Sequence, residues 1–361
     1  MTNEPTDRPA PPLPNGYGRT RTRITVRDVA RTVGVSPSTV SRVMSEGVGS
    51  ELIGEETRRK VRDAAAQLGY SPSPIAKALR GGHSNLIGLI LREIADPFFA
   101  RLSQELITCA RDEGYQIVLG YAHGDPNEEL NVSSVLDTRH IDGAIVMGDL
   151  TYNEQVLTTL LNTIPAAVGL CRGASTQGLF TVNSDNFSGI EALFNHLFDF
   201  GHRRISYLDG GLIGDIRERR QAFLRCANRR GLEIPTDYLQ KADDGLAGGY
   251  QAMGRLLALP NRPTAVIASD DIIAMGAVKA ALVQGLRVPE DISVTGFDDI
   301  ELAQYVHPSL TTVRQPVGVL VKQALDSLLT LIRQQPLPEA ESILRIPPTL
   351  IVRKSTAAPF R

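Results

Sequence analysis

The chain has 361 residues, 42% of them hydrophobic and 22% charged, with a formal net charge of -2 at pH 7. This length suits two or three globular domains. No apolar run approaches the roughly 18–20 residues that a membrane-spanning helix requires. The Pro-rich residues 1–23 contain no apolar core of a secretory signal, so we expect a disordered tail there and a cytoplasmic protein.

The residue types present argue against catalysis and metal binding. The three cysteines are far apart and odd in number, which fits a reducing compartment without a disulfide framework or a cysteine-based metal site. The sequence contains no G-x-S-x-G, P-loop, H-E-x-x-H or C-x-x-C motif, and its six histidines form no pair four residues apart. We therefore predict a protein that is not an enzyme and holds neither a cofactor nor a metal.

Charge is unevenly distributed along the chain. Residues 1–82 contain 13 Lys/Arg and 8 Asp/Glu, whereas residues 83–361 contain 25 and 32. A basic N-terminal part on an acidic body is the electrostatic pattern of a protein that binds nucleic acid at one end.

The first predicted elements are two short helices joined by a turn. Three valines recur at helical spacing over residues 25–33, with Thr25 as a suitable N-cap. Gly34 can end that helix with a positive φ, and Ser36 and Pro37 then suit the N-cap and first position of a second helix. This arrangement is a helix-turn-helix, whose second helix enters the major groove of DNA.

The second helix has an inner and an outer face. Val40 and Val43 face the core, while Arg42 on the other face can contact guanine through two hydrogen bonds. Thr39 and Arg31 are placed to contact the DNA backbone. The side chains that we expect to reach bases or phosphates from the outer face are Pro37, Ser38, Ser41 and Arg42.

A third helix and a short fourth one follow. An apolar face and a terminal glycine predict a helix over residues 55–68. Residues 73–82 begin with a Ser-Pro pair and end in two glycines, which leaves room for about seven helical residues, too few for a helix that is stable alone. We expect pairing with a second copy and DNA to stabilise it, with Leu79 inserted into a minor-groove base step. The alternatives are a protein-binding head and a plain linker in which Leu79 packs against a domain.

These residues resemble a known family. The runs VRDVARTVGVSPSTVSRVM and LGYSPSPIAKALRGG resemble the LacI/GalR family of bacterial transcription regulators. The resemblance implies that Pro37, Ser38 and Arg42 read bases and that Leu79 is the intercalating hinge leucine. The loop after the second helix, SEGVGSELIGEET, is about three residues longer than the family pattern, and Ser45 stands where Asn is frequent. The full set of predicted DNA contacts is Thr25, Arg31, Pro37, Ser38, Thr39, Ser41, Arg42, Lys77 and Leu79.

From Asn85 onward, short apolar runs alternate with helical stretches, which predicts parallel sheets covered on both faces and enough units for two doubly wound lobes. Strands are expected at 86–91, 115–120, 143–148, 165–170, 204–210, 238–240, 265–271 and 292–299, with a last strand in 346–356. Helices are expected at 98–113, 128–138, 154–161, 217–229, 250–259, 272–284 and 317–333.

Polar and aromatic residues follow several of these strands, where ligands bind in such sheets. Carboxylates and arginines can bind hydroxyl groups, and phenylalanines can stack on a ring, so a small polar ligand is expected. The alternative is that an Asp or Asn after a strand only caps the next helix. The residues concerned are Asp96 to Phe99, Arg172, Asp185, Asn186, Arg217, Arg219, Asp270 and Asp271.

The body also resembles the same family. Segments such as ADPFFARL and RPTAVIASDDIIAMGAV look like its effector domain, which is similar to periplasmic sugar-binding proteins with two lobes, a cleft and three crossovers. Cys171 stands where Asp is frequent and Asp244 at a variable position, so the ligand stays open. The implied effector contacts are Phe98, Phe99, Arg172, Asp185, Arg217, Arg219, Asp244 and, as the strongest candidate, Asp271.

The sequence thus predicts an N-terminal all-α helix-turn-helix head with a hinge helix, followed by an α/β two-lobed, periplasmic-binding-protein-like domain with two doubly wound parallel sheets. The predicted domains are a tail (1–23), the head (24–72), the hinge (73–82) and the effector and dimerisation domain (83–361), with an N-lobe of about 85–180 and 313–340 and a C-lobe of about 181–312 and 341–356.

The predicted function is that of a regulator in the cytoplasm, associated with the nucleoid, most simply a repressor. It would bind a palindromic DNA operator as a homodimer under the control of a small, sugar-like effector, without contact with a membrane. The alternatives are a solute-binding protein without a role at DNA, and a regulator that depends on a co-repressor or both represses and activates transcription. No leucine heptads follow the helix at 317–333, so no tetramerisation coil is expected.

Overall fold

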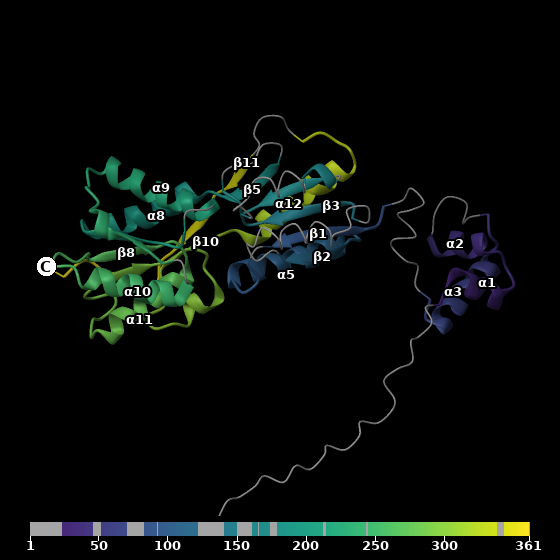
Figure 1. Ribbon diagram of the computed structural model, residues 1–361, viewed down its shortest axis with the longest axis horizontal. Helices are drawn as coiled ribbons and strands as arrows, with labels where there is room; N and C mark the ends of the chain where they lie inside the picture. The colour runs from purple at the N-terminus through teal and green to yellow at the C-terminus, as the bar shows by residue number, and fades with distance from the viewer. Residues whose placement is uncertain are drawn as a thin grey trace, which may run out of the picture. The chain divides into compact units, whose positions relative to one another are not determined.

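A computed structural model divides the chain into two compact units, residues 1–82 and 83–361 (Figure 1). Several predictions lie outside the described residues: the tail at 1–23, residues 46–51 of the lengthened loop, the hinge helix with Lys77 and Leu79, Asp244, the helix at 128–138 and nearly all of the helix at 154–161. The structure describes residues 24–45, 52–70, 83–91, 93–121, 141–149, 161–164, 166–173, 179–211, 214–242, 245–337 and 343–360.

The first unit contains three described helices, α1 (Val26–Val33), α2 (Pro37–Ser45) and α3 (Glu55–Leu68). Gly34 has φ 77° and ends α1, and Gly69 ends α3 in the same left-handed conformation, as predicted. One small core joins the three helices, because each contributes a buried apolar face. The core residues are Val29, Ala30, Val40, Val43, Val61, Ala64 and Ala65.

The second unit begins with a six-stranded, all-parallel sheet in the order β11-β5-β4-β3-β1-β2. Helices α5 (Pro97–Asp112) and α12 (Val317–Ile332) pack against each other and against this sheet (Figure 1). Its strands are β1 (Leu86–Leu91), β2 (Gln116–Tyr121), β3 (Gly143–Met147), β4 (Ala167–Leu170), β5 (Phe180–Ser184) and β11 (Ile343–Ile346).

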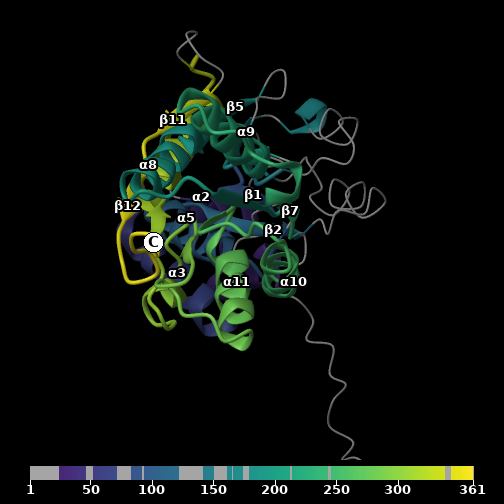
Figure 2. The same ribbon diagram turned by 90° about the vertical axis from the view of Figure 1, so that its left-hand side faces the viewer.

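A second parallel sheet, in the order β7-β6-β8-β9, forms the other lobe. The pair α8 and α9 covers one face and the pair α10 and α11 the other (Figures 1 and 2). The strands are β6 (Ile205–Asp209), β7 (Leu239–Lys241), β8 (Ala265–Ala268) and β9 (Ser293–Thr295). The helices are α8 (Asn186–Asp199), α9 (Gly214–Arg229), α10 (Gly245–Leu257) and α11 (Asp271–Val283).

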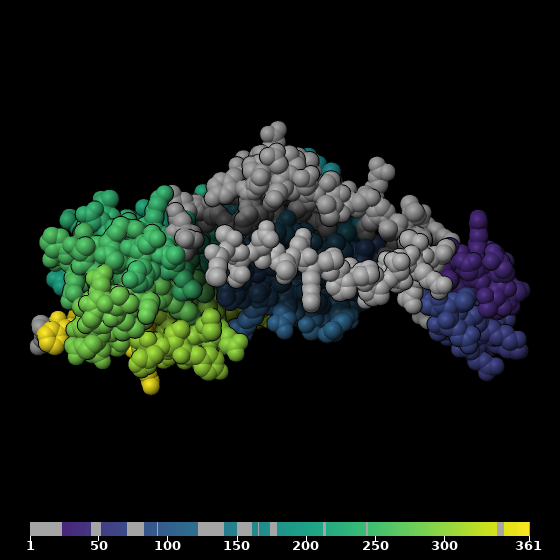
Figure 3. Space-filling model, turned by 60° about the horizontal axis from the view of Figure 1, so that its bottom comes forward, coloured from purple at the N-terminus to yellow at the C-terminus, as the bar shows by residue number. Residues whose placement is uncertain are grey.

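The chain passes between the two lobes three times: between β5 and α8, between β10 (Thr312–Arg314) and α12, and between β11 and β12 (Thr349–Ile351). Strands β10 and β12 pair antiparallel beside the crossovers. Figure 3 shows the blue segments of the first lobe abutting the green and yellow-green segments of the second.

The lobe limits and several elements differ from the sequence-based expectation, which included neither helix α8 nor strand β10. Strand β5 was not predicted, and it belongs to the first sheet together with β11, whereas both had been placed in the C-lobe. The expected single last strand is two short strands, because Pro347 and Pro348 lack the N–H groups that continued pairing needs. No helix among the described residues is long and apolar enough to cross a membrane.

Candidate functional site

The start of α2 is held by a small hydroxyl network. Ser36 Oγ accepts a hydrogen bond from the backbone N–H of Thr39 at 3.1 Å, which is the N-cap geometry predicted for this serine. Ser36 Oγ also lies 2.7 Å from Ser38 Oγ and 2.8 Å from Thr39 Oγ1. These contacts fix the first turn of α2, so the side chains of this turn are presented in one orientation.

Helix α2 presents an exposed polar face. Pro37, Ser38 and Arg42 are exposed, whereas Ser41 and Thr39 are half-buried. Val40 and Val43 are buried in the core of the head, as the valine spacing predicted. Ser41, which was predicted on the outer face, is less exposed than Pro37, Ser38 and Arg42.

Helix α1 starts at a reciprocal pair. The backbone N–H and the hydroxyl group of Thr25 both donate to Asp28 Oδ2, at 2.9 and 2.6 Å. These hydrogen bonds lower the pKa of Asp28. Arg31 lies on the exposed side of the same helix, 3.5 Å from Asp28. Thr25 is therefore the N-cap of α1 in the structure, and Arg31 is an exposed cation in the last turn of that helix.

In the second unit, Arg219 of α9 is the centre of a buried polar cluster. Its Nε donates to Asn186 Oδ1 at 2.9 Å and its Nη1 to the carbonyl oxygen of Ser269 at 2.7 Å. Nη1 also lies 3.4 Å from Asp298 Oδ1, and the guanidinium group lies 3.8 Å from the ring centre of Phe297. The guanidinium thus joins the segments that follow β5, β8 and β9 at their carboxyl ends.

Two successive aspartates after β9 have positive φ, 112° for Asp298 and 52° for Asp299. Such backbone costs free energy for a residue other than glycine and persists only where the surroundings hold it. Gln315 Nε2 donates to Asp298 Oδ1 at 2.6 Å. Arg314 and Arg353 each donate to Asp299, both at 2.6 Å. Ionic hydrogen bonds from the crossover segments therefore hold this turn.

A second buried ion pair lies where the lobes touch. Arg172, after β4, is 2% exposed and lies 3.3 Å from Asp149, which follows β3. Burial lowers the pKa of Arg172, and the charge of Asp149 opposes that change. Gly173 packs so closely on Gly214, the first residue of α9, that a side chain at residue 173 would overlap its backbone. We call this contact region, together with the Arg219 cluster, the lobe junction.

Carboxylates outnumber arginines at the lobe junction. Burial raises the pKa of Asp96 and of Asp270, and the charge of Asp270 raises the pKa of Asp96 further. Burial also raises the pKa of Asp298 well above its ordinary value, although Arg219 opposes this rise. Burial raises the pKa of Asp215 to about 6. The region therefore offers many hydrogen-bond acceptors and few cations.

One ion pair of the lobe junction links a strand of the first lobe to a helix of the second. Arg345 on β11 donates two hydrogen bonds to Glu218 on α9, at 3.0 and 2.9 Å. Asn186 Nδ2 donates to Glu218 at 2.9 Å and to Asp215 at 3.0 Å. Glu218, Arg345 and Asp298 were not among the predicted site residues. The only sequence signal was the position of Asp298 at the end of a predicted strand, because the partners come from distant segments.

The predicted effector contacts fall into different environments. Phe98 is buried in the core of the first lobe, and Phe99 lies against Gly148 at the end of β3. Arg172 and Arg219 are buried in the lobe junction. Arg217 is exposed, because residues two positions apart on a helix point to nearly opposite sides.

Two predicted aspartates have structural partners. Asp185 is the N-cap of α8 and accepts a hydrogen bond from the N–H of Ser188. Asp271 is fully buried, with Oδ2 accepting from the N–H of Ile300 at 2.9 Å and Oδ1 from Thr312 Oγ1 at 2.5 Å. Asp185 therefore holds a helix end and Asp271 a loop in this structure, and their contact with an effector stays a prediction. Among the described residues, no group of three or more His, Cys, Asp or Glu is placed to hold a metal.

Comparison with known proteins covers nearly the whole chain. Residues 25–73 match the model for bacterial regulatory proteins of the lacI family, and residues 194–356 match the periplasmic binding protein-like domain. The HTH-type transcriptional repressor PurR of Erwinia tasmaniensis is 36% identical over 344 residues, which span 93% of this chain and 98% of that protein. This chain belongs to the lacI family of bacterial regulatory proteins. It is an effector-controlled transcriptional repressor of that family.

Other family members agree in sequence and in fold. PurR of Serratia proteamaculans is 34% identical over 93% of this chain and 98% of its own length. The structure of the lac repressor dimer bound to operator and the anti-inducer ONPF has a TM-score of 0.82 at 27% identity, covering 93% of this chain and all of that one. The transcriptional regulator CelR in complex with cellobiose has a TM-score of 0.68 at 26% identity, covering 92% and 100%.

Proposed function

We propose that this repressor binds a palindromic operator as a homodimer and that a small polar molecule bound at the lobe junction controls its affinity for DNA. The observation that carries the proposal is the exposed polar face of α2, held in one orientation by the Ser36 hydroxyl network. A preformed helix start of this kind can enter the major groove without further ordering. The protein would act in the cytoplasm, on chromosomal DNA.

In this proposal the outer face of α2 reads the bases. Arg42 would contact guanine and Ser38 and Pro37 would meet neighbouring bases, while Thr25 and Arg31 on α1 would contact phosphates. Ser41 and Thr39 would complete the contacts to the backbone. Lys77 and Leu79, in the hinge segment, would act in the minor groove, where Leu79 would open a base step.

A dimer is supported by exposed apolar side chains on both lobes. Large apolar residues on α10 and α11 expose 41–57% of their surface, and Tyr305 exposes 72%. Apolar surface of this kind marks protein contacts when it is contiguous. Two-fold symmetry would match a palindromic site with two half-sites. The residues concerned are Ile107 and Leu119 in the first lobe and Leu246, Tyr250, Leu282, Val283 and Tyr305 in the second.

For the effector we propose a neutral, hydroxyl-rich molecule such as a sugar. Asp96, Asp270 and Asp298 surround one arginine, so the lobe junction can accept many hydrogen bonds from hydroxyl groups, whereas an anionic ligand would meet carboxylates. Phe99 can pack against a sugar ring. The complex of the related CelR with cellobiose supports this class. A nucleobase is the second candidate, since it would use the same acceptors and the same ring.

Closure of the lobes on the effector would change the angle between the two first lobes of the dimer, and the hinge helices would then pair or separate. A coupling of about 1–3 kcal/mol between the two sites changes DNA affinity roughly 5- to 150-fold. Whether the effector weakens or strengthens DNA binding follows from which lobe arrangement it prefers.

The test is selection of fragmented genomic DNA by the purified protein, followed by sequencing, with and without candidate effectors. We expect enrichment of one palindrome and a change in its retention with a sugar. A Leu79→Ala variant should bind the selected operator more weakly and bend it less, while it binds the effector normally. Failure to enrich any sequence, in the presence of the sugar and nucleobase panel, would contradict the proposal.

A further inference from the structure

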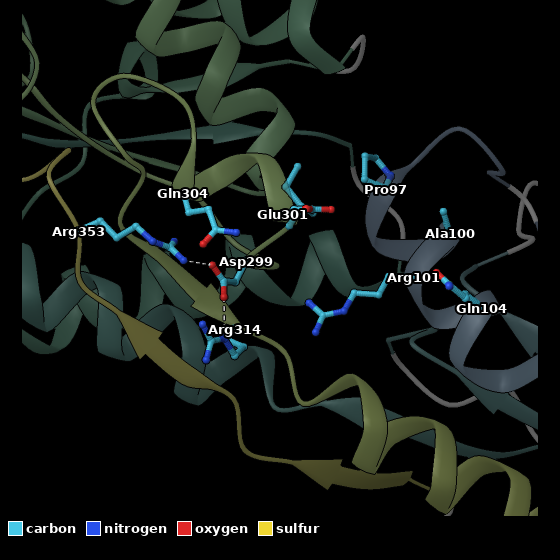
Figure 4. A pocket seen from close by; sticks show the side chains of 10 residues that line it. Pro97, Ala100, Arg101, Gln104, Asp299, Glu301, Gln304, Arg314 and Arg353 are labelled. Atoms are coloured by element: carbon cyan, nitrogen blue, oxygen red, sulfur yellow. Dashed lines mark hydrogen bonds and ion pairs between the residues drawn. The ribbon is translucent and has the colours of Figure 1, made fainter. Parts of the chain in front are cut away.

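An opening lies between α5 and the segment after β9, next to the crossover segments. It has a volume of about 710 Å³, within the usual range for small-molecule sites. One wall is the first two turns of α5 in the first lobe, and the other is the segment after β9 with the adjoining crossovers (Figure 4). The charged residues that line it are Arg101, Asp299, Glu301, Arg314 and Arg353.

The arginines of this opening differ in how many of their N–H groups already donate hydrogen bonds within the protein. Arg353 is 15% exposed and is used inside the wall, where it donates to Asp299 Oδ1 and to the carbonyl oxygen of Leu310. Arg314 is 52% exposed and uses only its Nε, on Asp299 Oδ2, among the described contacts. Both carboxylate oxygens of Asp299 are therefore occupied, and the outer nitrogens of Arg314 remain available to a ligand.

Arg101 completes the arrangement from the opposite wall. Its side chain extends from α5 across the opening toward Arg314 and Asp299 (Figure 4). No hydrogen bond or ion pair to another described residue holds its guanidinium group. Two arginines from different lobes thus converge with unused donors, at a place where Asp299 is already neutralised and the first turn of α5 adds its positive dipole end.

We infer that this opening binds a small phosphorylated metabolite, with Arg101 and Arg314 as the phosphate ligands. Guanidinium groups bind phosphate through paired, charge-assisted hydrogen bonds. The lobe junction, with its excess of carboxylates, would repel the same anion, so the two sites would select opposite ligand chemistry. The exposed carboxylate of Glu301 is the single lining acid without a described partner, and it should weaken the binding of an anion.

A phosphate bound there would link the lobes. Arg101 moves with α5 and Arg314 with β10, so bridging the two guanidinium groups favours one lobe arrangement over others. Through linkage, the anion would change the affinity for the effector and, because this step rests on the proposed function, for the operator.

Direct binding can be measured by titration calorimetry of the full-length protein in a phosphate-free buffer at low ionic strength. The probes are inorganic phosphate, glucose 6-phosphate and, as the neutral comparator, glucose. We expect saturable binding of one glucose 6-phosphate per chain at the arginine site. Arg101→Gln should weaken it at least about tenfold, because two charge-assisted hydrogen bonds are lost. Glu301→Gln should strengthen it, because a like charge is removed.

The matched control is Arg111→Gln, at an exposed position of the same helix outside the opening. It removes one positive charge from α5 and should leave binding unchanged. Equal losses in the Arg101 and Arg111 variants would mean non-specific attraction and would overturn the inference, as would the absence of saturable heat with both anions. If inorganic phosphate binds as tightly as glucose 6-phosphate, the opening is a site for free phosphate. That result would refute the inference that the ligand is a phosphorylated metabolite. Binding of glucose that persists in Arg101→Gln belongs to the lobe junction.

These outcomes are independent of DNA binding. If the protein selects no operator but binds glucose 6-phosphate through Arg101, the proposed function is contradicted and the arginine site is supported. A protein that selects an operator but gives no Arg101-dependent heat retains the proposed function and loses the site.

Discussion

Single residues decide the chemistry of the head, and Arg42 is the clearest of them. Its side chain is exposed on α2 while the two valines beside it are buried, so its replacement leaves the core intact. Arg31 is a matched comparison, since it is also an exposed arginine of the same unit but lies on α1.

We expect Arg42→Ala to lower affinity for the selected operator by about 1–3 kcal/mol and to relax the preference for one base pair in each half-site, because a base contact is lost. Arg31→Ala should weaken all sequences alike and reduce the slope of affinity against salt by about one, because a phosphate contact is lost. Fluorescence anisotropy with operator and scrambled duplexes measures both. The same loss on both duplexes for Arg42→Ala would exclude it from base reading.

Asp271 provides a residue-scale test of pH dependence. Burial raises the pKa of this carboxyl group to about 8 from an ordinary value of 3.8, against two hydrogen bonds that favour the charged form. Between these two values the folded protein holds a proton that the unfolded chain has released. The free energy of unfolding therefore falls as pH rises through this interval, with a slope of up to about 1.4 kcal/mol per pH unit.

The variant Asp271→Asn cannot ionise, so its free energy of unfolding should fall less steeply than that of the wild type between pH 5 and about 8. Urea unfolding of both proteins at several pH values gives the two slopes, and Asp215 titrates in both and cancels in the comparison. Parallel curves for the two proteins would show that Asp271 does not bind a proton on folding.

At the scale of elements, the close packing of α10 on α11 depends on two glycines. A side chain at Gly249 would overlap the carbonyl oxygen of Ile273, and one at Gly276 would overlap that of Leu246. Both overlaps involve backbone atoms, which cannot rotate away. In the same helix α10, Gly254 has only the end of the Gln284 side chain near it.

We expect Gly249→Ala to destabilise the protein by about 1–3 kcal/mol, because the two helices must separate. The matched substitution Gly254→Ala should instead stabilise it by about 0.5–1 kcal/mol, because alanine restricts the unfolded chain and fits the helix. Denaturant unfolding compares the two. A loss of stability of the same size in both variants would mean that the close approach of the two helices does not determine the effect of the substitution at Gly249.

At the scale of the whole molecule, the chain consists of two units with separate cores. Among the described residues, seven buried apolar side chains form the core of the head, whereas buried apolar residues run through both lobes of the body. A small core contributes little free energy, so the head should be the less stable unit.

We predict that a chain of residues 83–361 folds alone and melts within about 2 °C of the body transition of the full-length protein, because no part of its core comes from the head. In the full-length protein a separate transition of the head should occur at lower temperature and rise when operator DNA is added. Differential scanning calorimetry resolves the two. A single cooperative transition, with a truncated body that melts many degrees lower, would show that the units stabilise each other.

The sequence by itself determined the local features of this protein. Helix ends at Gly34 and Gly69, the N-cap at Ser36 and the inward valines of α2 follow from neighbouring residues, and the chain order of strands and helices predicted parallel sheets. The family resemblance could be read from the same local motifs, because they lie within short runs of sequence.

Only the tertiary structure decided which residues meet. Arg345 pairs with Glu218 across 127 positions, β11 joins the sheet of the first lobe, and Asp271 lies buried behind Thr312. Periodicity reports which face of an element is apolar, but it does not report which distant segment covers a polar group. Which segment covers a buried charge depends on the free-energy cost of removing that charge from water. In this lobe junction, partners from distant parts of the chain offset that cost.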